Sequence, residues 1–141
     1  MKKSFEIKRL EDIKPFVTSI LPYLTLGTLV TLNGPLGVGK TTLVQEMAKQ
    51  LGVKSRVISP TFTIMKVYSL ELMKGRLLHV DAYRLEKSPS FGLDEEMGED
   101  TITMIEWPEK LSTIPSANQT IHLTIRFVNE QSRTIEMEIV S

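Results

Sequence analysis

The fold is decided by one stretch, Gly34-Pro35-Leu36-Gly37-Val38-Gly39-Lys40-Thr41, which fits the pattern G-x-x-x-x-G-K-[ST] of a phosphate-binding P-loop. Glycines let the backbone curl until successive N–H groups point inward and cradle a phosphate. A helix that starts near Lys40 adds its positive N-terminal end. In such a loop the lysine reaches the β- and γ-phosphates, and the threonine hydroxyl ligates Mg²⁺. The stretch therefore predicts a site for a nucleoside triphosphate with Mg²⁺, and the alternative is a glycine-rich turn without a ligand.

The residues on either side of this loop have the context that the motif requires. Thr28–Asn33 is a short apolar run that predicts a buried strand, and Lys40–Leu51 has apolar residues on one helical face before Gly52. Further out, Ser4–Leu10 predicts a first strand and Glu11–Leu24 a helix. The loop is thus expected between a strand and a helix.

Two further predicted strands end in acidic residues. Arg76–Val80 leads to Asp81, and Ile102–Ile105 leads to Glu106. P-loop sites need an acid at a strand end close to the metal. We expect one of these carboxylates to hold Mg²⁺, directly or through water, and the other to orient the attacking water. The catalytic candidates are therefore Asp81, Glu106 and Lys40, and a pair of structural strand-end carboxylates is the alternative.

The C-terminal part of the chain predicts an antiparallel hairpin. Ile121 to Phe127 and Ile135 to Ile139 alternate between apolar and polar residues around a turn at Asn129–Ser132. The polar residues 85–101 predict loop and one short helix. Together these elements predict an α/β, P-loop NTPase-like three-layer fold, with a mixed, mostly parallel sheet, in a single domain over residues 1–141.

Composition narrows the function classes. The 141 residues carry no net charge and no cysteine, which excludes thiolate metal sites and cysteine nucleophiles. A domain that binds nucleic acid by itself usually has a basic excess, so any RNA role is expected to run through a partner. The apolar stretch 17–32 is too interrupted for a membrane span, and the expected location is the cytosol. No Asn-Lys-x-Asp guanine motif occurs, so ATP is favoured over GTP.

Four segments resemble the TsaE (YjeE) family of small bacterial P-loop ATPases. They are residues 32–43, Ser59-Pro-Thr-Phe-Thr63, His79-Val-Asp-Ala-Tyr-Arg-Leu85 and Ile105-Glu-Trp-Pro-Glu109. The resemblance implies a role in making threonylcarbamoyladenosine in tRNA, in association with the TsaB and TsaD proteins. It implies an ATP hydrolase with low intrinsic activity that depends on these partners. Contact with tRNA would be indirect, through the complex.

The resemblance also implies roles for individual residues. Lys40 and Thr41 bind phosphate and Mg²⁺, and Thr42 lies beside the α- or β-phosphate. Glu106 resembles the metal-associated acid, and Asp81 resembles the second acid near the γ-phosphate. Thr61 belongs to a switch-like loop that faces the nucleotide, and Trp107 is expected close to the site. The full expected nucleotide-binding set is Gly34, Leu36, Gly37, Val38, Gly39, Lys40, Thr41, Thr42, Thr61 and Trp107, while Pro35 has no N–H to offer.

Two other functions are compatible with the same loop. A small-molecule kinase would close an arginine-bearing lid over its substrates, and the six arginines here are widely dispersed. A non-catalytic sensor would bind ATP without turning it over. Two roles stay open for Arg84, an arginine finger or a partner in a structural ion pair. His79 is expected to be a half-buried structural residue.

Overall fold

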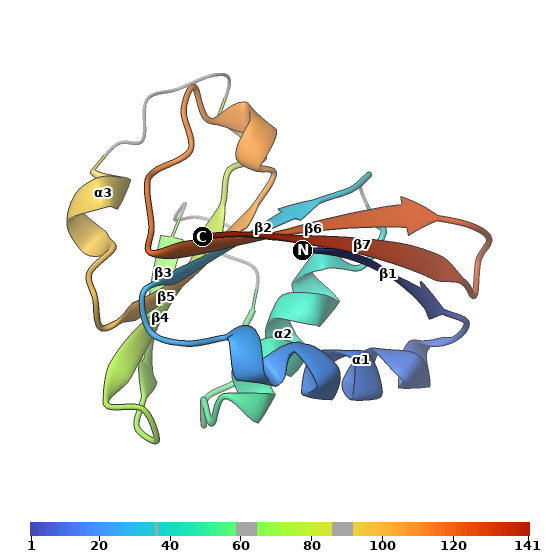
Figure 1. Ribbon diagram of the computed structural model, residues 1–141, viewed down its shortest axis with the longest axis horizontal. Coiled ribbons are helices and arrows are strands. Elements are labelled where there is room, and N and C mark those ends of the chain that lie inside the picture. Colours follow the sequence, from blue (N-terminus) through green and yellow to red (C-terminus); the bar gives the residue numbers. More distant parts are fainter. Residues whose placement is uncertain (36, 59–64, 86–91) are drawn as a thin grey trace.

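The computed structural model describes residues 1–35, 37–58, 65–85 and 92–141. These residues form a seven-stranded sheet in the order β1-β7-β6-β2-β5-β4-β3 (Figure 1). The strands are β1 (Lys2–Ile7), β2 (Thr28–Asn33), β3 (Met65–Leu70), β4 (Gly75–Asp81), β5 (Thr101–Glu106), β6 (Gln119–Phe127) and β7 (Arg133–Val140). The four central strands, β6, β2, β5 and β4, are parallel, and the outer pairings are antiparallel. The predicted α/β class, mixed sheet and C-terminal hairpin are confirmed.

Helical segments lie on both faces of this sheet (Figure 1). The helices α1 (Ile13–Ile20) and α2 (Lys40–Gln50) cover one face, and the 3-10 turns η1 (Leu10–Asp12) and η2 (Leu21–Tyr23) flank α1. On the other face lie the short helix α3 (Leu93–Glu96) and the 3-10 turn η3 (Pro108–Lys110). None of the helices in the described part of the chain has the length and apolarity needed to cross a membrane.

The core has two parts because the central strands are buried on both faces. In β2, Val30 belongs to the cluster that packs under α1 and α2, and its neighbour Leu29 belongs to the cluster under α3 and η3. Successive side chains of a strand point to opposite faces, so a continuous apolar run fits this position. The parallel centre is thus packed on both faces, and the carboxyl ends of its strands form the edge at which the P-loop begins.

The boundaries of several elements follow from local contacts. The predicted strand Ser4–Leu10 ends earlier, at Ile7, because the Asp12 carboxylate accepts hydrogen bonds from the N–H groups of Lys8 and Arg9, at 3.0 and 3.3 Å. The chain changes direction here and continues into η1. The predicted helix 11–24 is divided into η1, α1 and η2, with Pro22 in the last. Within the described part of 85–101, α3 is the expected short helix. The strand β3 was not predicted.

Candidate nucleotide site

The glycine-rich loop joins β2 to α2, as the sequence predicted. Gly34 lies so close to β6 that an added Cβ would come within 2.8 Å of the Ile125 carbonyl oxygen. Gly39 is the N-cap of α2 with φ of +107°, a conformation that disfavours other residues. At Gly37 and Gly39 an added Cβ would meet no described atom within 4 Å. The loop is therefore tight against the sheet and open on its other side, which suits a cradle for a ligand.

Lys40 has a buried side chain that turns back over this loop. It is 5% exposed, and its ammonium donates a hydrogen bond to the Gly34 carbonyl. The same ammonium lies 3.2 Å from the centroid of the Trp107 ring, a cation–π contact. Burial lowers the pKa of Lys40 below its ordinary value of 10.5, and the charges of Glu106, Glu109 and Asp81 oppose that shift. A phosphate entering the loop would meet a partly desolvated cation.

Glu106 lies at the end of β5, beside the first turn of α2. The Thr41 hydroxyl donates to both of its carboxylate oxygens, at 3.0 and 3.1 Å. The side chain is only 3% exposed, and its Oε2 atom also lies 2.6 Å from the Nε2 atom of His79. The loop threonine and one of the two strand-end acids are therefore in direct contact, whereas their expected role as metal ligands stays a prediction. The predicted half-burial of His79 is wrong, since this residue is completely buried on the face toward α2.

Asp81 is the register partner of Glu106 in the parallel pair β4–β5. The two acids thus lie side by side at the carboxyl edge of the sheet, as the sequence predicted. Asp81 is partly exposed, and its carboxylate accepts a hydrogen bond from the N–H of Tyr83 at 3.0 Å. The burial of the two carboxylates differs, and only Glu106 contacts Thr41 among the described hydrogen bonds. This difference separates two positions whose roles the pattern of strand-end acids left open.

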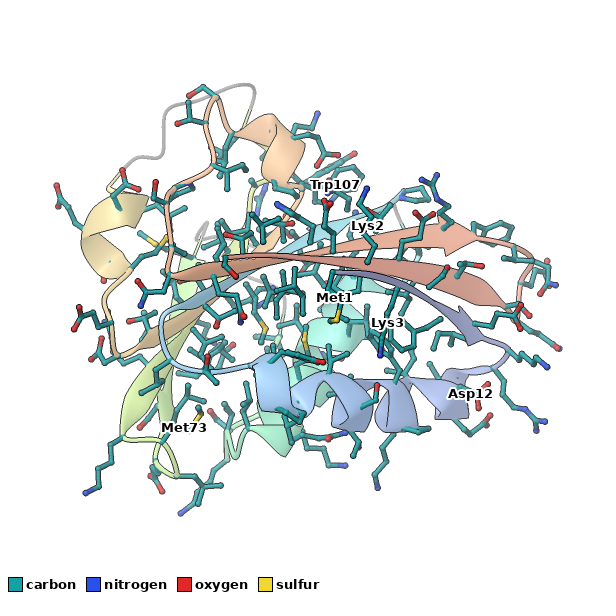
Figure 2. The ribbon with its side chains drawn as sticks, in the orientation of Figure 1. Met1, Lys2, Lys3, Asp12, Met73 and Trp107 are labelled. Carbon is teal, nitrogen blue, oxygen red and sulfur yellow. The ribbon has the colours of Figure 1, made fainter. Side chains whose placement is uncertain are left out.

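Trp107, labelled in Figure 2, lies where β5 leads into η3. Its φ of +60° is unusual for a residue with a side chain. The ring contacts Tyr83, with centroids 4.9 Å apart, in addition to the Lys40 ammonium. Trp107 therefore lies beside Lys40 of the loop, and its expected closeness to a nucleotide stays a prediction. Leu36 and Thr61, two further predicted contacts, lie outside the described residues.

A hollow of about 790 Å³ adjoins the loop at Gly37–Gly39. It is lined by Gly37, Val38, Gly39 and Thr42, by residues 8–11 after β1, and by Glu130, Gln131 and Arg133 of the β6–β7 hairpin. Arg133 also donates from Nε to the Val38 carbonyl at 3.2 Å. Sequence reasoning missed this arginine, because nothing in the alternating hairpin pattern indicates which residue reaches the loop.

Taken together, the sheet order, the loop between β2 and α2 and the paired acids define an α/β protein with the P-loop NTPase-like fold. The family model of "Threonylcarbamoyl adenosine biosynthesis protein TsaE" matches residues 7–135. The chain therefore belongs to the TsaE family, whose relatives are named for tRNA threonylcarbamoyladenosine biosynthesis.

Individual relatives are similar over most of the chain. The TsaE protein of Synechocystis is 44% identical in an alignment of length 99, which covers 66% of this chain and 62% of that protein. The chain thus spans less than two thirds of this relative's length. The TsaE protein of Borreliella burgdorferi is 31% identical over 136 residues, covering 94% and 96% of the two chains. The crystal structure of Bacillus subtilis YdiB superposes with a TM-score of 0.81 at 26% identity, over 100% of this chain and 87% of YdiB.

Proposed function

We propose that this protein binds Mg-ATP in the Gly34–Thr41 loop, hydrolyses it, and thereby supports formation of threonylcarbamoyladenosine in tRNA together with the TsaB and TsaD proteins in the cytoplasm. The observation that carries the proposal is the contact between the Thr41 hydroxyl, at the end of the loop, and the Glu106 carboxylate, at 3.0 Å. Family membership supports the biosynthetic role, and the site geometry supports the ATP chemistry.

The donor set at the base of the loop fits Mg²⁺. This ion prefers oxygen ligands, and it is usually held by one or two protein oxygens together with substrate phosphates. Thr41 and Glu106 offer a hydroxyl and a carboxylate at the start of α2. The described residues contain no group of three or more acidic, His or Cys side chains that could hold a metal alone. When bound, Mg²⁺ would neutralise charge on the phosphate oxygens.

The two acids receive different roles in this proposal. Glu106 stands on the metal side, because it is buried against Thr41. Asp81 is the partly exposed neighbour and orients the attacking water. Lys40 leaves the Trp107 ring for the β- and γ-phosphates and stabilises the charge that develops as the bond to the leaving ADP breaks.

The nucleoside is assigned to the hollow of about 790 Å³ beside Thr42. Its volume falls within the range of small-molecule sites, about 300–1,000 Å³. The preference for ATP over GTP rests on the missing guanine motif. Contact with tRNA is assigned to the partner proteins, because the chain carries no net charge that would hold a polyanion.

A combined binding and turnover assay tests this function. We expect Mg-ATP binding by the isolated protein and multiple-turnover phosphate release that rises when TsaB, TsaD and tRNA are added. Lys40→Ala should abolish both, while Arg126→Gln, on an exposed ion pair with Glu136, serves as a matched surface control. Absence of ATP binding, or hydrolysis by Lys40→Ala at the wild-type rate, would contradict the proposal. Binding without turnover in the complete complex would instead indicate a sensor. Transfer of the labelled γ-phosphoryl group of ATP to an acceptor other than water would indicate a kinase.

A further inference from the structure

His79 is a buried imidazole inside an apolar strand. It lies on β4 between Leu78 and Val80, and none of its surface is exposed. Its Nε2 atom is 2.6 Å from Glu106 Oε2, and its Nδ1 atom is buried without a hydrogen-bond partner among the described residues. Burying a polar ring with one unpaired nitrogen costs free energy that an apolar side chain of similar size would avoid. Packing alone therefore does not account for a histidine at this position.

The contact with Glu106 explains why an imidazole is present at this position. At this distance one proton must lie between the nitrogen and the carboxylate oxygen, and we assign it to Nε2. Glu106 then accepts from His79 on one side and from Thr41 on the other, so rotation of its terminal carboxylate is restrained. Without such a restraint the last torsion of a glutamate has a broad energy profile.

The nearby Lys40 makes this restraint matter. The charge of Glu106 acts on the Lys40 ammonium, although none of the described ion pairs joins the two side chains. If the carboxylate swung toward the ammonium, the resulting ion pair would remove the acid from Thr41 and the cation from the phosphates. A fixed carboxylate keeps both groups available.

We propose that His79 is the positioning residue of the nucleotide site, whose Nε2–H holds the Glu106 carboxylate against Thr41 and away from Lys40. The inference rests on the proposed function, since it assigns Glu106 to the metal side of a Mg-ATP site. Partners of this kind behind a metal-side ligand affect metal affinity or activity by about 10–100-fold when they are replaced.

The experiment compares three variants with the wild type. His79→Leu keeps the volume but removes the donor, and His79→Gln places an amide N–H near the position of Nε2. Met104→Leu is the matched control, because Met104 is the register partner of His79 and is equally buried without a polar contact at the site. Fluorescence of Trp107, the single tryptophan, reports ATP binding in EDTA and then the Mg²⁺ midpoint of the ATP complex. Phosphate release is measured alongside.

For His79→Leu we expect the Mg²⁺ midpoint to rise at least about tenfold and kcat to fall by a similar factor. ATP binding in EDTA should change less than about twofold, because the loop itself is untouched. His79→Gln should recover most of the loss, and Met104→Leu should match the wild type. An unchanged midpoint in His79→Leu, or a His79→Gln variant no better than His79→Leu, would overturn the inference.

Two further outcomes are distinguishable. If the wild type binds no Mg-ATP, the proposed function and this inference both fail, whereas an unchanged His79→Leu midpoint removes the inference alone. Should His79→Leu not fold, His79→Asn replaces it, because its shorter side chain leaves the amide short of Glu106. The same midpoint and rescue criteria then apply.

Discussion

Lys40 is the residue at which burial and function conflict. Its ammonium rests on the Gly34 carbonyl and the Trp107 ring, and burial lowers its pKa below 10.5. A phosphate would supply the missing counter-charge and raise that pKa again. Since only the ammonium form attracts phosphate, ATP affinity is expected to fall as the pH rises toward 10.5, earlier than for an ordinary lysine.

Titration calorimetry of ATP binding across the alkaline range measures this dependence, with Lys40→Gln as the non-titrating control. The control should bind weakly and with no such slope. The sign for folding is the reverse. The unfolded chain holds the Lys40 proton between the lowered pKa and 10.5, so the stability of the ligand-free protein gains from this group as the pH rises through that window. If ATP affinity depended on pH with the same slope in the wild type and in Lys40→Gln, the assignment of phosphate binding to Lys40 would be contradicted.

Neutralising Asp81 and neutralising Glu106 are expected to change kcat and Mg²⁺ affinity in different ways. Glu106→Gln removes the charge beside Thr41, so both kcat and Mg²⁺ affinity should fall, each by about 10–100-fold. Asp81→Asn removes the group assigned to water, so kcat should fall by about 100-fold at an unchanged Mg²⁺ midpoint. Initial rates over a Mg²⁺ titration separate the two. An exchange of these patterns would reverse the roles of the acids.

At the scale of elements, the β6–β7 hairpin supports the loop from outside the parallel centre. Ile125 on β6 lies against Gly34, and Arg133 on β7 donates to the Val38 carbonyl. Arg133→Gln should raise the Kd of ATP by about tenfold. A hydrogen bond from a charged donor contributes about 1.5–3 kcal/mol, and water replaces part of that contribution in the variant. The kcat at saturation should stay within about twofold, since no reacting group moves.

The control for this prediction lies on the same hairpin. Arg126 pairs with Glu136 at the surface, where both side chains are largely exposed. Arg126→Gln should therefore leave the Kd unchanged. Equilibrium binding of ATP to both variants provides the measurement, and equal effects would show that hairpin charge, and not the contact with Val38, determines the affinity.

The same elements show what sequence reasoning could reach. The strand Thr28–Asn33 and the helix start at Lys40 were predicted at their observed positions, because the loop motif and the apolar periodicity agree there. The end of β1 was misplaced, since Asp12 acts through its side chain on two backbone N–H groups. The contact of His79 with Glu106 was missed because it depends on the β4–β5 register. Period-two spacing does place His79 on the same strand face as Asp81, which was the available signal.

At the scale of the whole molecule, the candidate site joins parts of the chain that are far apart in sequence. Strand β1 pairs with β7, so the residues after β1 lie next to the hairpin turn (Figure 1). Residues 8–11, the loop and residues 130–133 then line one hollow. A ligand that fills it should stabilise all three segments together, although more than 100 residues separate the first from the last.

Hydrogen exchange followed by mass spectrometry tests this coupling. With Mg-ATP at 100 times its Kd, opening that requires ligand release costs about 2.7 kcal/mol more, which slows exchange by up to about 100-fold. We expect this protection at residues 8–11, 37–42 and 128–133. The turn at residues 71–74 between β3 and β4 extends from the opposite end of the sheet in Figure 1 and should show none. Protection confined to residues 37–42 would place the nucleoside outside the hollow, and protection of undiminished size in Lys40→Gln at the same ATP concentration would place the whole ligand elsewhere.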